Sequence, residues 1–174
     1  MIKNFFRHLH TVNKHRFLVM KLCFKLGLYR QGLLHDLSKY SPTEFIPGVR
    51  YFQGTRSPIS AERHEIGYSL AWTHHQTSNP HHWQYWLRYH NGDYDDLHMP
   101  ENYIKEMVAD RIAACMVYQK EKYHKSSALE FFHNGHESQY MPRSIYDKLE
   151  RCLKIVADNE LDEALKIIRT TSLL

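Results

Sequence analysis

The stretch Leu33-Leu34-His35-Asp36-Leu37-Ser38-Lys39 places two metal-binding side chains next to each other in an apolar segment. The imidazole of His35 and the carboxylate of Asp36 are both ligands for divalent ions, although neither atom type selects one metal. On a helix, Lys39 follows Asp36 by three residues and His35 by four, so it projects from the same side. A cation beside a metal-bound carboxylate suits a phosphate group. This stretch is therefore the first candidate for a functional site.

Apolar residues on both sides of this stretch recur at helical spacing, and no segment of useful length alternates apolar and polar residues. The chain has seven Gly and six Pro, fewer than the turns of an all-β protein of this size require. The sequence therefore predicts an all-α fold, organised as a single domain over residues 1–174. We expect helices at residues 4–26, 30–40, 60–75, 80–90, 101–124, 127–133, 144–157 and 160–170, and loops at 42–58 (with one helical turn at 43–46), 76–79 and 91–100.

The composition is that of a globular protein, because 43% of the 174 residues are hydrophobic and 24% are charged. The formal net charge of +4 fits an anionic small molecule or a weak nucleic-acid surface, and it does not decide between them. The apolar residues from 17 to 28 are interrupted by Lys21 and Lys25, so we expect neither a signal peptide nor a membrane span.

Three cysteines, Cys23, Cys115 and Cys152, lie far apart in apolar segments. The chain has no Cys-x-x-Cys pair, which argues against a thiolate zinc site and against a disulfide framework. A reduced, cytoplasmic compartment is therefore expected.

Four metal-binding side chains fall on apolar faces of the predicted helices. Asp110, for example, follows Met107 by three residues and so faces the core. A carboxylate is almost never fully buried unless it is paired or bound to a metal. Each of these residues taken alone could be a structural histidine or an ion-paired carboxylate, but together, with Lys39 in register, they predict a metal site. The four residues are His15, His35, Asp36 and Asp110.

Two histidine pairs, His74-His75 and His81-His82, flank the short break at residues 76–79. His75 shares a helix face with Ala71, and His82 shares one with Trp86, so we expect His75 and His82 to point inward. They would complete a second metal position, and His74 and His81 would be left to hydrogen-bond a substrate. The alternative is that these are solvated histidines at helix ends.

His64 shares the phase of His75, because the two are eleven residues apart. Eleven residues of continuous helix span about 16 Å, however, whereas metal–ligand bonds are about 2 Å long. His64 is therefore a secondary candidate, which could bind the same ion only if the helix breaks.

The order of these residues resembles that of the HD-domain superfamily of metal-dependent phosphohydrolases. His15, the pair His35-Asp36 and Asp110 follow the superfamily pattern H…HD…D, and Lys39 matches the lysine of the HD-x-x-K variant. The resemblance covers residues 12–120. It implies an HD-like helical bundle on which the helices of residues 127–172 pack, with His15, His35, Asp36 and Asp110 as primary ligands and Lys39 in contact with phosphate.

Two further segments extend the resemblance. His64-Glu65-Ile66-Gly67 and His74-His75 are similar to elements of two-metal HD proteins, although they lie closer together in this sequence. The segment from Ala71 to Trp83 resembles a narrower group of HD-like proteins from bacteria and their phages. That narrower likeness implies no established substrate.

The predicted function is hydrolysis of a phosphate ester, with a nucleotide as the leading substrate class. One or two divalent ions would activate water and polarise the phosphoryl group, and the sequence does not distinguish Mn, Fe, Co, Zn or Mg. Asp36 would bridge two ions, and Asp36 and Lys39 are the candidate catalytic residues. A small phosphorylated partner is expected, a nucleic acid is not favoured, and the oligomeric state is left open.

Two alternatives from other classes remain open. Some HD relatives use two iron ions and O₂ to cleave carbon bonds with the same ligand types, so the site could belong to an oxygenase. The chain could also be a non-enzymatic helical binding module with structural histidines and a basic face.

Overall fold

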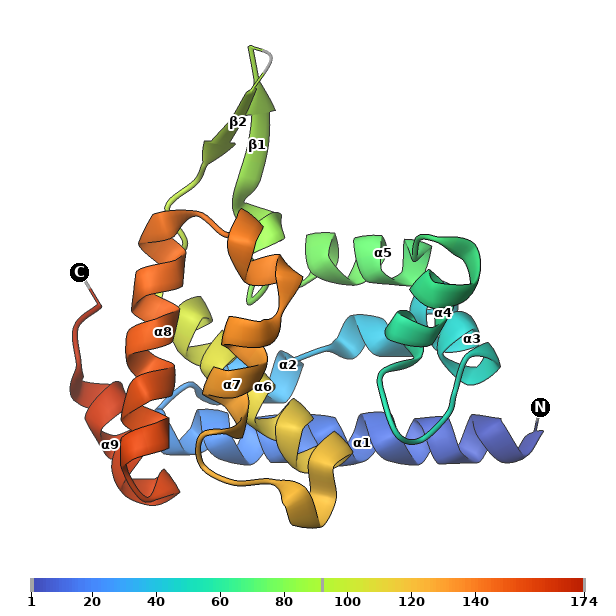
Figure 1. Cartoon of the computed structure of the whole chain (residues 1–174), viewed down its shortest axis with the longest axis horizontal. Helices are drawn as coiled ribbons and strands as arrows, with labels where there is room; N and C mark the ends of the chain where they lie inside the picture. Colours follow the sequence, from blue (N-terminus) through green and yellow to red (C-terminus); the bar gives the residue numbers. More distant parts are fainter. Residues whose placement is uncertain (1, 92, 174) are drawn as a thin grey trace.

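The computed structural model describes residues 2–91 and 93–173, and its architecture is all-α, as the periodicity predicts. The 24-residue helix α1 (Ile2–Lys25) runs along one edge of the molecule, and α6 (Glu101–Gln119) packs against it (Figure 1). The other helices are α2 (Tyr29–Leu34), α3 (Pro42–Arg50), α4 (Pro58–Ile66), α5 (Leu70–Ser78), α7 (Ser127–Asn134), α8 (Arg143–Asp158) and α9 (Leu161–Thr170). Short 3₁₀ segments are η1 (Leu37–Tyr40), η2 (Trp83–Trp86), η3 (Lys120–Lys122) and η4 (His136–Tyr140).

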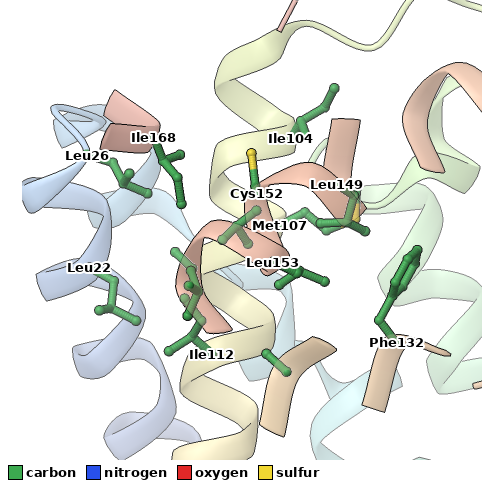
Figure 2. Packing of buried hydrophobic residues seen from close by; sticks show 14 of the residues in the cluster. Leu22, Leu26, Ile104, Met107, Ile112, Phe132, Leu149, Cys152, Leu153 and Ile168 are labelled. Atoms are coloured by element: carbon green, nitrogen blue, oxygen red, sulfur yellow. The ribbon is translucent and has the colours of Figure 1, made fainter. Parts of the chain in front are cut away.

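One cluster of buried apolar side chains joins α1, α6, α8 and α9 (Figure 2). Leu22 of α1, Ile112 of α6 and Ile168 of α9 belong to it, so the C-terminal helices pack on the same core as the segment that carries the motifs. Burial of such side chains is the main stabilising contribution to a fold of this kind. It fixes the position of α6 against α1, and both helices carry polar residues of the site described below.

The predicted helix over residues 30–40 is wrong at its centre, because α2 ends at Leu34 and η1 begins at Leu37. Between them Asp36 has a left-handed backbone with φ of 53°. Aspartate tolerates this conformation better than most residues, since its short side chain can bond locally. Arg16 of α1 secures the turn by donating from Nε to the carbonyl of His35 at 2.7 Å and from Nη2 to that of Leu33 at 3.2 Å.

In the loop expected over residues 42–58, the predicted helical turn at 43–46 is confirmed but too short, because α3 continues to Arg50. Pro42 occupies the first helical turn, where a missing N–H costs nothing. Pro47 and Gly48, which suggested a loop, lie inside the helix. Tertiary contacts stabilise this segment, and they include the edge-to-face pair of Phe45 with Phe5 at 5.2 Å between ring centroids.

The single helix expected over residues 60–75 is divided into α4 and α5. Gly67, with φ of 84°, ends α4 in the left-handed conformation typical of a glycine at a helix terminus. Ser69 then caps α5 by accepting a hydrogen bond from the backbone N–H of Trp72 at 2.9 Å. The end of α5 at Ser78 lies within the loop that we expected at residues 76–79.

The helix expected over residues 80–90 is not formed. Instead η2 is followed by β1 (Leu87–His90), which pairs antiparallel with β2 (Asp93–Asp96) in a hairpin that projects from the helices (Figure 1). Asn91 has φ of 49°, and Asn-Gly between two short runs is the strongest short-range signal for a hairpin. Gly92 itself lies outside the described residues. This signal was present in the sequence, but the helical spacing of the tryptophans concealed it.

The remaining helices lie close to their predicted positions, although α6 ends at Gln119 rather than at residue 124. Lys120 has φ of 53°, which ends the helix and starts η3. Across residues 2–91 and 93–173, no helix combines the length and the hydropathy needed to cross a bilayer.

A close contact between α1 and α3 leads to a stability prediction. A Cβ atom at Gly48 would overlap the imidazole of His8, which is held between Phe45 (5.1 Å between ring centroids) and Phe52 (5.8 Å). We expect Gly48→Ala to lower the free energy of unfolding by about 1–3 kcal/mol. In a His8→Ala background the same change should be stabilising, because Ala exceeds Gly in helix propensity by about 1 kcal/mol. Urea denaturation of the four proteins checks this change of sign, and equal effects in both backgrounds would contradict it.

Candidate metal centre

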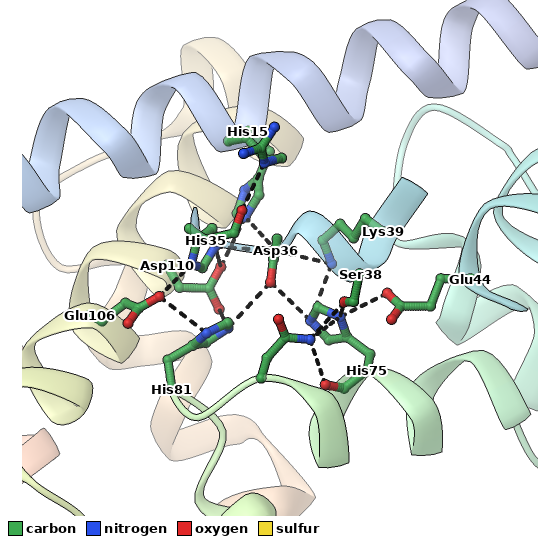
Figure 3. Close-up of polar contacts among 12 residues, drawn as sticks. His15, His35, Asp36, Ser38, Lys39, Glu44, His75, His81, Glu106 and Asp110 are labelled. Atoms are coloured by element: carbon green, nitrogen blue, oxygen red, sulfur yellow. Dashed lines mark hydrogen bonds and ion pairs between the residues drawn. The ribbon is translucent and has the colours of Figure 1, made fainter. Parts of the chain in front are cut away.

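The carboxylate of Asp36 is the point on which the polar residues of the interior converge (Figure 3). It is 1% exposed and lies at the turn between α2 and η1. Residues from α1, η1, α5, the turn after α5 and α6 surround it. These residues are His15, His35, Lys39, His75, His81 and Asp110.

The structure brings together the four residues that were predicted as a first metal site. His15 Nε2 lies 2.9 Å from Asp110 Oδ1 and 3.6 Å from Asp36 Oδ2. His35 Nε2 lies 3.2 Å from Asp36 Oδ2 and 3.6 Å from Asp110 Oδ1. All four ligand atoms lie within 4.8 Å of one another. Atoms this close can surround one ion with bonds of about 2 Å after small adjustments.

A second group of potential ligands faces the other oxygen of Asp36. His75 Nε2 lies 3.4 Å and His81 Nε2 3.5 Å from Asp36 Oδ1. Together with His82, these histidines offer three nitrogen atoms within 4.8 Å of one another. Asp36 therefore presents one oxygen to each group, which is the arrangement that a bridging carboxylate requires.

The buried atoms at the centre fit a cation. Within the described chain, His35 Nε2, both carboxylate oxygens of Asp36, His81 Nε2 and His82 Nε2 are buried and have no hydrogen-bond partner. Buried polar atoms are nearly always hydrogen-bonded, so five such atoms in one place need an explanation. Imidazole nitrogens and carboxylate oxygens are the donors that Mn, Fe, Co and Zn accept. The donor set fits one or two divalent ions.

Two glutamates fix the orientation of the histidines. Glu106 of α6 places Oε1 2.9 Å from His35 Nδ1 and 3.3 Å from His81 Nδ1, so one carboxylate serves a histidine of each group. Glu44 of α3 places Oε2 2.8 Å from His75 Nδ1. With Nδ1 directed at a carboxylate, Nε2 of each of these histidines faces the centre, which is how carboxylates orient metal-binding histidines.

The electrostatics of the centre favour charged carboxylates. Burial alone would raise the pKa of Asp36 and Asp110, but the surrounding cationic and hydrogen-bonding groups hold both pKa values well below the usual range. For Asp36 these groups are His35, Lys39 and His75. Burial would lower the pKa of Lys39, but the nearby carboxylates outweigh burial and raise it. Burial and the neighbouring His81 hold the pKa of His82 well below its usual value, so His82 is neutral and its lone pair is free.

Three of the predicted site residues have other positions than expected. His81, predicted to contact substrate, is 1% exposed and lies deep in the cluster as a candidate ligand. His74, predicted to contact substrate as well, is part-exposed and places Nδ1 2.7 Å from Glu44 Oε1. The helix that carries His64 does break, at Gly67, but His64 lies on the exposed surface of α4 and joins none of the described clusters.

Sequence reasoning missed both glutamates. Glu106 lies four residues before Asp110 on the same face of α6, so its spacing was a usable signal. Glu44 lay in the single helical turn predicted at residues 43–46, which is too short to assign a buried face. Asn79 was also missed as a contact of the site. Its side chain donates to Ser38 Oγ at 2.8 Å and to the carbonyl of His75 at 2.7 Å.

A cavity of about 500 Å³ opens onto the centre and includes His15, His75, His82 and Asp110 in its wall. This volume is in the range of pockets for small molecules. Lys39 reaches the centre from η1, with Nζ 3.2 Å from Asp36 Oδ2 and 3.3 Å from His75 Nε2. Three arginines also line the cavity, Arg56, Arg63 and Arg111, so that with Lys39 four cations stand against three carboxylates, those of Glu44, Glu62 and Asp110. The cavity therefore suits an anionic ligand.

The fold and the site together define an all-α protein with a buried histidine–carboxylate centre at the base of a cationic cavity. Residues 4–158 match the model of a family of unknown function (DUF5662), and the chain belongs to this family. No curated protein and no solved structure matches the chain.

The two glutamates allow a prediction about metal affinity. Glu106 touches a histidine of each group, so Glu106→Ala should weaken the binding of two ions, each by about ten- to a hundred-fold. Glu44 touches only the second group among the candidate ligands in the described chain, so Glu44→Ala should weaken one ion. Titration of the metal-free proteins with Mn²⁺ by calorimetry measures both affinities.

Glu62→Ala is the control for this comparison. Glu62 is also a buried glutamate, but it accepts a hydrogen bond from Ser69 Oγ and lies outside the clusters. Its removal should leave Mn²⁺ affinity within about twofold of the parent. Loss of a single ion in both Glu106→Ala and Glu44→Ala would contradict the assignment of Glu106 to both groups.

Proposed function

We propose that this protein is a metal-dependent phosphohydrolase that cleaves a phosphate ester, with a nucleotide as the leading substrate class. The observation that carries the proposal is the buried carboxylate of Asp36, which lies between two groups of histidines and beside Lys39 at the base of a cationic cavity. The resemblance of the motif order to HD-domain phosphohydrolases supports the same assignment.

In this proposal His15, His35, Asp36 and Asp110 hold one ion, and Asp36 with His75, His81 and His82 holds a second. When bound, such ions supply Lewis-acid chemistry to a phosphate ester and lower the pKa of water. The nitrogen-rich donor set favours Mn, Fe, Co or Zn over Mg, which prefers oxygen ligands.

Lys39 has a different role from the ligands. Its ammonium group lies at the cavity wall, charged at neutral pH because the nearby carboxylates raise its pKa against the effect of burial. It would neutralise the charge of the reacting phosphate and hold it against the centre. Glu44 and Glu106 act through the histidines, which they orient, and are positioning residues.

A di-iron oxygenase would use the same donor types, and the cationic cavity is the feature that favours a hydrolase over it. The two activities differ in their need for O₂. A hydrolase should release phosphate from a mixture of nucleoside monophosphates under anaerobic conditions with Mn²⁺ alone, whereas an oxygenase should require iron and O₂.

A cytoplasmic setting is part of the proposal, supported by the three free thiols of Cys23, Cys115 and Cys152.

Substitutions at two residues separate binding of metal from handling of substrate. Asp36→Ala and Asp36→Asn should both remove metal and phosphatase activity together, because Asp36 contacts both groups. Lys39→Ala should retain the metal and lower turnover by about ten- to a hundred-fold, since a charge-assisted contact contributes roughly 1.5–3 kcal/mol. Elemental analysis and a phosphate-release assay measure the two properties.

Lys14→Ala is the matched control, because Lys14 is an exposed lysine of α1 outside the cavity wall. It should leave metal content and turnover as in the parent. A Lys39→Ala protein with normal metal and turnover within about twofold of the parent would count against the phosphohydrolase assignment as a whole.

A further inference from the structure

Helix α6 presents two neighbouring stripes of side chains to the interior. Glu106 and Asp110, four residues apart, belong to the metal centre. The second stripe lies one residue further along, again at a spacing of four, and lines the wall of the cavity. It consists of Met107, Arg111 and Cys115. Successive residues of a helix diverge by about 100°, so the second stripe faces a region beside the centre and not the centre itself.

Arg111 is a half-buried cation without an anionic partner. Its Nε atom is buried and has no hydrogen-bond partner in the described part of the chain. Its Nη2 atom lies 3.9 Å from the sulfur of Met107, and its guanidinium carbon lies 5.5 Å from the centroid of the Phe132 ring. Among residues 2–91 and 93–173 no carboxylate forms an ion pair with it. A partly buried guanidinium with one unpartnered N–H, in the wall of a cavity and without a counter-charge, points to an anion supplied from outside the chain.

The other cations of the cavity have partners or are exposed. Lys39 lies against Asp36. Arg56 donates to Gln53 Oε1 at 2.8 Å, and the exposed Arg63 lies over the ring of Trp72 at 5.6 Å. Among these cavity cations, Arg111 is therefore the partly buried one that has no anionic partner in the described chain, and an anion in the cavity could bind to it.

We propose that Arg111 binds a second anionic group of the substrate, separate from the phosphoryl group held at Lys39. This inference rests on the proposed phosphohydrolase function and narrows its substrate class to phosphate esters that carry another phosphate or a carboxylate. Lys39 reaches the centre from η1 beside Asp36 and His75, whereas Arg111 extends from α6 beside Met107 and Phe132. The planar fork of a guanidinium suits bidentate binding of either oxyanion.

Phosphonates test this without turnover, because hydrolysis of a phosphate ester cannot cleave their carbon–phosphorus bonds. The probes are methylphosphonate with one anionic group, propane-1,3-diphosphonate with two phosphonates, and 3-phosphonopropionate with a phosphonate and a carboxylate. Calorimetry with the Mn²⁺-loaded protein gives Kd for each. We expect one or both of the two-anion probes to bind at least tenfold more tightly than methylphosphonate, and the better one identifies the second group.

The decisive quantity is the ratio of Kd for methylphosphonate to Kd for the better two-anion probe. Arg111→Gln should lower this ratio by about ten- to a hundred-fold, and Arg111→Lys should lower it less. Chelation of Mn²⁺ by a diphosphonate affects every variant alike and cancels when ratios are compared. Arg151→Gln, which changes an exposed arginine of α8, should leave the ratio unchanged. Thermal unfolding verifies that each variant is folded.

The possible failures are distinct. If methylphosphonate shows no Mn²⁺-dependent binding to the parent protein, the proposed function fails and this inference fails with it. If methylphosphonate binds and the two-anion probes bind no more tightly, only the second-anion inference is overturned. An unchanged ratio in Arg111→Gln also overturns it, and equal weakening of all probes would instead assign Arg111 to the reacting phosphoryl group.

Discussion

The burial of one carboxylate, that of Asp36, is the constraint on which the interior of this protein depends. A charged carboxylate out of water is strongly destabilising unless cations and hydrogen-bond donors surround it. His35 and Lys39 lie on one oxygen and His75 and His81 on the other, drawn from segments that are separated in sequence. The α2–η1 turn, α5 and the turn that follows it are thereby held around a single group.

Helix α6 connects this polar interior with the apolar core. Val108 and Ile112 are fully buried in the cluster shared with α1, α8 and α9, while Glu106 and Asp110 face the histidines. A helix fixed by apolar packing on most of its circumference holds its polar side chains to a narrow range of positions. The geometry of the centre therefore depends on α8 and α9, although within the described chain these helices contribute none of the candidate metal ligands.

Much of the fold and part of the site follow from sequence, and the reasons differ by residue. Helical spacing placed Asp110 and His15 on buried faces, because that information is local. His82 is buried in the cluster as expected, but His81 is buried there too, because the segment after Pro80 is a turn and a 3₁₀ segment in which helical phase cannot separate the two. The role of Glu44 could not be predicted, since α3 depends on contacts with α1 and α5 that no local pattern encodes.

The left-handed backbone of Asp36 limits how this family can diverge. At φ of 53° the residues that fit with least strain are Gly, Asn and Asp, and most other side chains crowd their own backbone there. Residue 36 is thus restricted twice, by its left-handed backbone and by the need for a carboxylate in the centre. A homologue that no longer bound metal would not need the carboxylate but would keep the backbone restriction. Gly or Asn at this position, beside otherwise drifting histidines, would be the trace of a lost centre.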